Sequence, residues 1–310
     1  MNRVVLAADL GGTNLRMAAI DREGGILYRT RRETPRDKSA REIISMISDA
    51  AGECRRNVEE RIAAIAAAVP AIIDFEKGIT LKLPNLPALN NFHLSSALEK
   101  ELNLPCILEN DANAAAIGEN WLGASKNIKN SILVTLGTGV GGGIIIDGKI
   151  LRGMDGTAGE IGHICVEPFG APCGCGARGC LEQYASATAI VRLARGLENE
   201  FPKSSISNCE VLSSLEIYEA GTSGDELALE VFRRQGFYLG LALAGLINVL
   251  NPEIVVIGGG AAAGWDLFAP EMHKQIRERA YRQPAARARI VRAHLGDDAG
   301  ILGVSKLAFL

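Results

Sequence analysis

Four side chains between positions 163 and 180 are of the types that bind a transition metal. His163, Cys173, Cys175 and Cys180 offer one imidazole and three thiolates, with glycines interspersed among the cysteines. This set completes the tetrahedral coordination that Zn²⁺ prefers and leaves no open position for a catalytic water. The spacing therefore predicts a structural zinc site, which would hold neighbouring side chains in place. We call residues 163–180 the metal knuckle.

Cysteines also occur in proteins for two reasons that involve no metal. A cysteine is often a small buried apolar residue, and this role is the better interpretation of Cys54, Cys106, Cys165 and Cys209. A disulfide framework is the second possibility, but seven cysteines is an odd number, and the N-terminal run VVLAADL is too short for a secretory signal. Within the knuckle, His163 keeps a second ring nitrogen that can contact a ligand.

Three glycine-rich loops follow segments with the pattern of a β-strand, where α/β proteins bind their ligands. DLGGTN at 9–14 joins an aspartate that can hold a hydrated Mg²⁺ to glycines and a threonine that suit phosphate oxygens. LGTGVGGG at 136–143 repeats this arrangement, and GGG at 258–260 leaves room for a flat base. One such loop would more often be an ordinary turn, but three favour a nucleotide site without a Walker sequence. The predicted nucleotide and phosphate residues are Asp9, Gly11, Gly12, Thr13, Gly137, Thr138, Gly139, Gly258, Gly259 and Gly260.

Asp111 is the residue that we expect to act in catalysis. It offers a carboxylate where a predicted strand, PCILEN at 105–110, meets a predicted helix, DANAAAIGENWL at 111–122. The alternative is a helix N-cap, a position for which aspartate is preferred. Both roles can be filled if one of Asn110 and Asp111 caps the helix while the other faces a ligand.

The elements that would position these residues alternate between strand and helix, which is typical of an α/β protein. A weak internal repeat is present, because residues 4–30 and 131–153 both have the pattern strand, glycine turn, strand, tight turn and strand. The repeat predicts two related lobes. The spacing of apolar residues predicts the remaining elements: helices at 39–60, 226–250, 266–281 and from 299, a central strand at 62–69, and strands at 253–258 and near 290.

The bulk composition excludes several classes of protein. A formal net charge of −3 and a pI near 5.9 give no basic footprint for nucleic acid or an anionic membrane. The longest apolar stretch, 237–250, is shorter than a bilayer requires. Free thiols in a metal knuckle favour a reducing compartment. We therefore expect a cytoplasmic protein that binds small molecules and neither nucleic acid nor membrane.

Together these motifs resemble the ROK family (repressor, open reading frame, kinase) of the actin-like ATPase superfamily, and within it the bacterial sugar kinases that act on glucose. The motifs are DLGGTN, PNLP at 84–87, ENDANAAAIGE at 109–119, LGTGVGGG, GTAGEIGH at 156–163 and CGCGARGCLE at 173–182. The last two are highly specific, whereas DxGGT is shared by many actin-like proteins. With GGG at 258–260, the match extends over essentially the whole chain.

The resemblance implies an actin-like (ribonuclease H-like) α/β fold of two lobes with an interlobe cleft. The small lobe would comprise 1–115 and a C-terminal helix at 298–310, and the large lobe 116–297. The implied reaction is ATP-dependent phosphorylation of a hexose, first of all glucose to glucose 6-phosphate, with Mg²⁺ accompanying ATP. Asp111 matches the family's general base. The positions that match sugar-binding residues are Asn85, Asn110, Asp111, Glu160, His163 and Glu182. A homodimer or homotetramer is also implied.

Three alternative functions remain open. Kinases for N-acetylmannosamine, N-acetylglucosamine, fructose or allose share the knuckle and the glutamates, and two departures from the family pattern, Ala71 and Leu89, lie on the sugar side. A sugar-sensing repressor would need a helix-turn-helix domain ahead of the first strand, for which no room is expected. The third alternative is a nucleotide-binding module without catalysis, against which ENDANAAA and EIGH argue.

Overall fold

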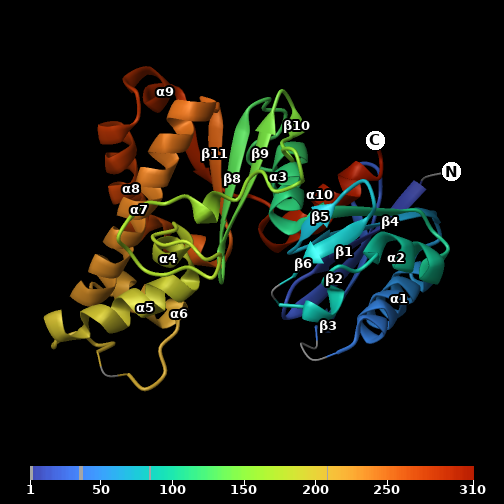
Figure 1. The fold of residues 1–310 in the computed structure, drawn as a ribbon, viewed down its shortest axis with the longest axis horizontal. Coiled ribbons are helices and arrows are strands. Elements are labelled where there is room, and N and C mark those ends of the chain that lie inside the picture. Colours follow the sequence, from blue (N-terminus) through green and yellow to red (C-terminus); the bar gives the residue numbers. More distant parts are fainter. Residues whose placement is uncertain (1–2, 35–37, 84, 208) are drawn as a thin grey trace. The chain divides into compact units, whose positions relative to one another are not determined.

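The computed structural model describes residues 3–34, 38–83, 85–207 and 209–310 (Figure 1). The chain divides into two compact units, each described here by itself. The first comprises Met1–Lys129, Gly143–Gly159 and His294–Leu310, and the second comprises Asn130–Gly142 and Glu160–Ala293.

The first sheet has the strand order β3-β2-β1-β4-β7. Its strands are β1 (Arg3–Leu10), β2 (Asn14–Ile20), β3 (Ile26–Glu33), β4 (Arg61–Val69) and β7 (Cys106–Asn110). Strands β1 to β3 form an antiparallel meander, whereas β4 pairs in parallel with both β1 and β7. The predicted strand at 62–69 is therefore confirmed as an inner strand.

Helices pack on both faces of this sheet (Figure 1). Successive residues of a strand point to opposite faces. Leu6 and Leu10 of β1 accordingly pack in one core, with α1 (Ala40–Arg56) and α2 (Leu94–Leu102). Val5 and Ala7 pack in another, with α3 (Asp111–Trp121) and α10 (Ala299–Leu307). A hairpin of β5 (Ile72–Asp74) and β6 (Ile79–Lys82), followed by a 3₁₀ turn at Pro87–Leu89, lies beside the first core.

Helices α3 and α10 meet at backbone contact. A Cβ at Gly303 would lie 1.6 Å from the carbonyl oxygen of Ala114, and one at Gly118 would lie 2.2 Å from that of Ala299. Only glycine allows so close an approach at these two positions. The contact fixes α3, which begins at the predicted catalytic aspartate, against the last helix of the chain.

The second sheet has the order β10-β9-β8-β11-β12. Its strands are β8 (Ser131–Leu136), β9 (Val140–Ile146), β10 (Lys149–Ile150), β11 (Ile254–Gly258) and β12 (Arg289–Arg292). Both sheets thus consist of a three-stranded meander followed by two strands, which confirms the predicted repeat. Asp147 and Gly148, between β9 and β10, have φ of 50° and 75°, as the predicted hairpin turn of Asp-Gly requires.

The helices of the second unit include the longest one of the described residues, α7 (Glu226–Leu250), which confirms the predicted helix at 226–250. The others are α4 (Glu182–Ala185), α5 (Ala187–Leu197), α6 (Ser214–Thr222), α8 (Trp265–Arg279) and α9 (Arg282–Arg287). The prediction from sequence missed α4, α5, α6 and α9 here, and α2, β5 and β6 in the first unit.

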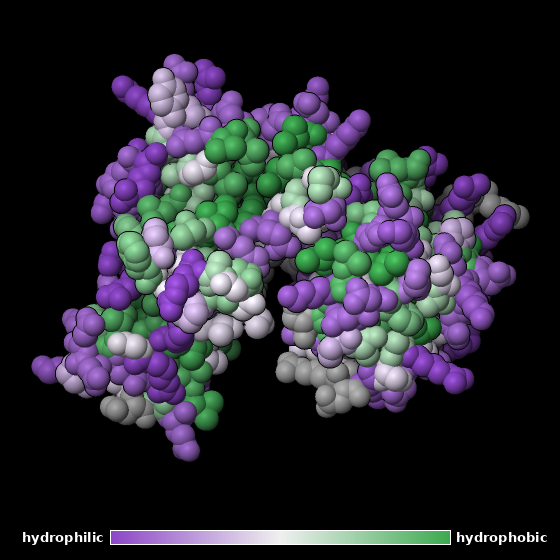
Figure 2. Space-filling view, viewed as in Figure 1, coloured by the Kyte–Doolittle hydropathy of each residue, from purple (hydrophilic) through white to green (hydrophobic). Residues whose placement is uncertain are grey.

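Helix α7 is buried on one side and exposed on another. Gly236 and Gly240 lie against the backbone of α8, whereas Val249 is 81% exposed. An apolar groove of about 590 Å³ runs beside the C-terminal half of the helix, and Figure 2 shows hydrophobic residues gathered on the second unit. Over the described part of the chain, no helix is both long and apolar enough to cross a bilayer.

Candidate active site and metal centre

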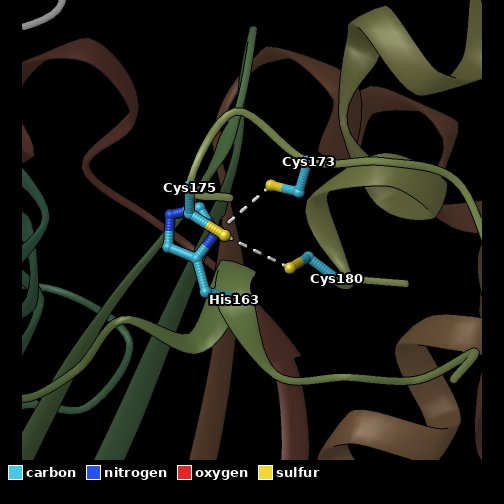
Figure 3. A group of neighbouring side chains, drawn as sticks. All are labelled: His163, Cys173, Cys175 and Cys180. Carbon is cyan, nitrogen blue, oxygen red and sulfur yellow. Dashed lines mark hydrogen bonds between the residues drawn. The ribbon is translucent and has the colours of Figure 1, made fainter. Parts of the chain in front are cut away.

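The metal knuckle brings its four predicted ligands together (Figure 3). All four ligand atoms lie within 4.8 Å of one another. Nδ1 of His163 is 3.6 Å from Sγ of Cys173, and Sγ of Cys175 is 3.6 Å from Sγ of Cys180. Around a tetrahedral zinc ion with bonds of about 2.0–2.3 Å, neighbouring ligand atoms are about 3.5–3.8 Å apart. These separations fit a Cys₃His zinc site.

The path of the knuckle depends on its glycines. Isolated bridges join Cys165 to Cys180 and Pro172 to Arg178. Gly179 has φ of 69°, and a Cβ there would lie 1.7 Å from the carbonyl oxygen of Glu167. A side chain at this position would therefore push the bridged segments apart and separate the cysteines.

The environments of two ligand thiols differ. Burial raises the pKa of the Cys180 thiol to about 12, so its thiolate needs a nearby positive charge. The pKa of Cys175 is lowered, chiefly by a hydrogen bond from the backbone N–H of Ala177. The Nε2 atom of His163 is 3.8 Å from Oε2 of Glu160, which is too far for a hydrogen bond.

The loop Gly137–Val140 joins β8 to β9, and we call it the nucleotide loop after its predicted role. The N–H of Gly137 donates to the carbonyl of Gly139 at 2.9 Å. Oε2 of Glu182, the first residue of α4, accepts from the N–H of Val140 at 3.1 Å, and a Cβ at Gly139 would lie 2.3 Å from the same oxygen. Gly137 differs, because the nearest described atom to its Cβ would be 4.0 Å away. The open space beside Gly137 suits a ligand lying on the backbone.

The third glycine loop follows β11. Gly259 has φ of 85°, and a Cβ there would lie 2.5 Å from the carbonyl oxygen of Leu136, so only glycine fits. Gly260 begins a 3₁₀ turn, Gly260–Gly264. A Cβ at Gly260 would have no described atom within 4 Å. This loop therefore combines a fixed backbone with an open side.

In the first unit, the loop after β1 turns tightly, with the N–H of Gly11 donating to the carbonyl of Asn14 at 2.9 Å. A Cβ at Gly12 would lie 2.7 Å from the Cβ of Asn85. The predicted phosphate loop and the predicted sugar residue Asn85 are therefore neighbours. Pro84, the first residue of the PNLP motif, lies outside the described residues.

Asp9 is largely buried near the end of β1. Its side chain is 17% exposed, and its Oδ2 accepts from Nη1 of Arg16 at 3.1 Å. Burial raises the pKa of Asp9, while the Arg16 guanidinium acts in the opposite direction. Asp9 pairs with Ala68 of β4, which in turn pairs with Glu109 of β7. The two carboxylate residues are thus two strands apart, about 10 Å, at the carboxyl edge of the sheet.

The structure shows which of Asn110 and Asp111 caps the helix. Oδ1 of Asn110 accepts from the N–H groups of Ala112 and Asn113 at 3.0 and 3.1 Å, so Asn110 is the N-cap of α3. Asp111 is the first residue of the helix, and its Oδ1 accepts from Ala112 at 2.9 Å. Its carboxylate lies at the helix end where backbone N–H groups favour negative charge.

An ion pair next to Asp111, between the buried Glu109 and the partly exposed Arg152, was not predicted. Glu109 is fully buried, and its Oε2 accepts from Nε and Nη2 of Arg152 at 3.0 and 2.6 Å. Its Oε1 accepts from the N–H of Asn110 and from Nδ2 of Asn113 at 3.0 and 3.1 Å. The Arg152 guanidinium lies over the ring of Phe75, 4.8 Å from its centroid. The first turn of α3 is therefore anchored by a charged network.

The structure places the predicted residues in two groups. The first unit holds Asp9, Gly11, Gly12, Thr13, Asn85, Asn110 and Asp111. The second unit holds Gly137, Thr138, Gly139, Glu160, His163, Cys173, Cys175, Cys180, Glu182, Gly258, Gly259 and Gly260.

Comparisons with known proteins agree over the length of the chain. The model of the ROK family matches residues 5–309. A glucokinase of Halalkalibacterium halodurans is 38% identical, with 97% of this chain and 94% of that protein covered. Among solved structures, a ROK family glucokinase from Streptomyces griseus in complex with glucose and AMPPNP is 33% identical, with a TM-score of 0.84 and 98% of both chains covered.

A solved ROK family transcriptional regulator, described as a homolog of the E. coli MLC protein, is also similar. It is 30% identical, with a TM-score of 0.90, and the match covers 98% of this chain and 77% of the regulator.

Proposed function

The chain belongs to the ROK family, and from this premise we propose that it transfers the γ-phosphoryl group of ATP to a hexose, with glucose as the preferred sugar. The observation that carries the proposal is the full-length likeness to a glucokinase whose structure holds glucose and AMPPNP. The 38% identity to a second glucokinase supports the same sugar. The fold is the predicted α/β fold of the actin-like ATPases.

Asp111 is proposed as the general base. Its carboxylate would take the proton of the sugar hydroxyl as that oxygen attacks the γ-phosphorus and the bond to the β–γ bridging oxygen breaks. A base placed in this way contributes about 10²–10⁴-fold to the rate. The capping role of Asn110 supports the assignment, because α3 does not need the Asp111 side chain as its N-cap.

The polar side chains that we propose to bind the sugar hydroxyls are Asn85, Asn110, Glu160, His163 and Glu182. The proximity of His163 and Glu160, whose Nε2 and Oε2 atoms are 3.8 Å apart, supports a hydroxyl site in the second unit. For Asn110 the donor would be Nδ2, because Oδ1 caps the helix. A carboxylate that loses its hydroxyl partner is left unpaired, so such a site rejects sugars that lack the matching group.

Two metal ions are part of the proposal. Zinc would be held by His163 and the three knuckle cysteines, where it stabilises the fold. Mg²⁺ would accompany ATP beside Asp9 and neutralise charge on the phosphate oxygens. The position of Asp9 near the end of β1, next to the glycines of the predicted phosphate loop, supports this placement.

A second candidate is sugar sensing without catalysis, which the likeness to the ROK family transcriptional regulator favours. The two functions differ in their dependence on ATP. A kinase consumes ATP only when its sugar is present, whereas a sensor binds the sugar and consumes none.

A panel of sugars in a coupled ADP-release assay tests the proposal. The panel comprises glucose, N-acetylmannosamine, N-acetylglucosamine, fructose and allose, and we expect the highest kcat/KM with glucose. Asp111→Asn should bind glucose normally, fold normally and lose at least about 10²-fold in kcat, because the base is gone. Near-normal turnover in this variant would remove Asp111 from the mechanism. Absence of ADP release with every sugar would favour the sensor.

A further inference from the structure

The nucleotide loop is held by the segment that immediately follows the metal knuckle. The N–H of Ala187 donates to the carbonyl of Gly137 at 2.8 Å. Oγ1 of Thr188 donates to the carbonyl of Thr138 at 2.9 Å. The N–H of Val140 donates in turn to the Glu182 carboxylate, so three residues between 182 and 188 contact the loop. The chain reaches this segment directly from the metal ligand Cys180.

Val140 is contacted by the neighbours of two metal ligands. Its N–H donates to Glu182, two residues after Cys180. Its carbonyl oxygen lies against Gly162, the residue before His163, where a Cβ would be only 2.1 Å from that oxygen. A metal bound to His163 and Cys180 would therefore set the distance between the two segments that flank Val140.

Side chains also link the knuckle to the surface beside the nucleotide loop. Nε2 of Gln183 lies 3.8 Å from Sγ of Cys173, and Nη1 of Arg192 donates to Oε1 of Gln183 at 2.5 Å. Arg192 also lines a shallow depression of about 500 Å³, whose other walls include Thr138 and Thr188. The surface next to the nucleotide loop is thus linked to the knuckle through one glutamine.

We propose that the metal knuckle positions the nucleotide loop, so that metal binding determines the affinity for nucleotide as well as stabilising the fold. This inference rests on the proposed function, in which the loop binds the phosphates of ATP. Backbone N–H groups bind phosphate well only if they are already oriented, because ordering them on binding costs affinity. With metal bound, the knuckle holds the backbone of the nucleotide loop in that orientation through the contacts of Glu182, Ala187 and Thr188.

The first test compares Mg·ADP binding to the intact protein and to Cys175→Ser by titration calorimetry, with metal content measured by mass spectrometry. Cys175 is exposed, so its loss should release the metal without leaving a core cavity. We expect the affinity for Mg·ADP to fall about tenfold or more, as two or three loop hydrogen bonds are weakened. Unchanged ADP affinity in a metal-free, folded variant would overturn the inference.

The second test leaves the metal ligands untouched. Thr188→Val removes the hydroxyl that donates to Thr138 and keeps the shape of the side chain. We expect about fivefold weaker binding of Mg·ADP, with glucose affinity and metal content unchanged. Thr188→Ser should restore the affinity. Thr222→Val is the matched control, because Oγ1 of Thr222 donates to the carbonyl of Glu219 at 2.7 Å in the same way, but on α6.

A third variant separates failure of the inference from failure of the proposed function. Gly137→Ala meets no described atom closer than 4.0 Å, so the protein should fold while the added methyl group obstructs a bound phosphate. If Gly137→Ala binds Mg·ADP normally, the phosphate-loop assignment is wrong. If it loses affinity while Cys175→Ser and Thr188→Val do not, the loop is correctly assigned but the knuckle does not position it.

Discussion

Asp111 is supported by a side chain that sequence patterns could not connect to it. Glu109 belongs to the predicted ENDANAAA motif, but its partner Arg152 is 43 positions away, and no periodicity or spacing relates the two. The N-cap residue of α3 could not be predicted for a related reason. Asn110 and Asp111 are both preferred N-cap residues, and only the geometry of the helix end selects Asn110. The knuckle ligands could be predicted because all four lie within one short segment.

The ion pair allows a double-mutant test at this scale. Arg152→Met leaves the buried Glu109 charge without its cation, and we expect it to lower the free energy of unfolding by about 3 kcal/mol and kcat by about tenfold. Adding Glu109→Gln removes the unpaired charge and should recover part of the stability. Urea unfolding of both single variants and the double variant gives the coupling energy. Additive effects would show that the two side chains act independently.

Among the helices, length determined which ones the sequence pattern could predict. The 25-residue helix α7 shows its apolar pattern over several turns and was predicted with its correct bounds. Helix α4 has only four residues and no side-chain cap, so its sequence holds too little pattern. Helix α6 could have been found, because Ser213 and Glu216 form a capping box that is visible as S-x-x-E.

Helix α7 carries a prediction about pH. Hydrogen bonds from Arg233 and then Arg234 hold the pKa of Glu230 at about 2, below its ordinary 4.5. A carboxyl group whose pKa is lowered by folding stabilises the protein above pH 4.5 and loses that contribution as the pH falls towards 2. Its side chain is 20% exposed and the arginines more so, which limits the effect to about 1 kcal/mol.

The measurement is urea unfolding at pH 6 and pH 3.5. The intact protein should lose about 0.5 kcal/mol more between these values than Glu230→Gln does, because pH 3.5 lies between the two pKa values and removes about half of the contribution. The control is Glu278→Gln, which changes an exposed glutamate of α8. Equal losses in the intact protein and in Glu230→Gln would contradict the prediction.

For the molecule as a whole, the internal repeat was the most useful pattern. It predicted two related halves, and the two sheets share one strand order. What the repeat could not show is which segments join which half, because residues 143–159 belong to the first unit although they include β10 and most of β9 of the second sheet. That membership depends on tertiary contacts such as the one between Arg152 and Glu109.

The division into two units predicts which parts of the protein lose protection from hydrogen exchange when the metal is removed. Because all four knuckle ligands lie in the second unit, a chelator should raise amide hydrogen exchange in peptides from 137–142 and 160–188. Peptides from β1, β4 and β7 should keep their protection, since each unit has its own core. Amide hydrogen exchange, measured by mass spectrometry with and without the chelator, checks this prediction. Equal loss of protection in both units would mean that they open together.

The contact of α3 with α10 also bears on how the protein is made. A ribosome that has added residue 293 has completed every residue of the second unit, yet the first still lacks its last segment. Until α10 is synthesised, Ile301 and Val304 are not available to pack against Val5, Ala7 and Ala114. The core of the half that carries Asp111 can therefore be completed only once α10 has been synthesised, after every residue of the second unit.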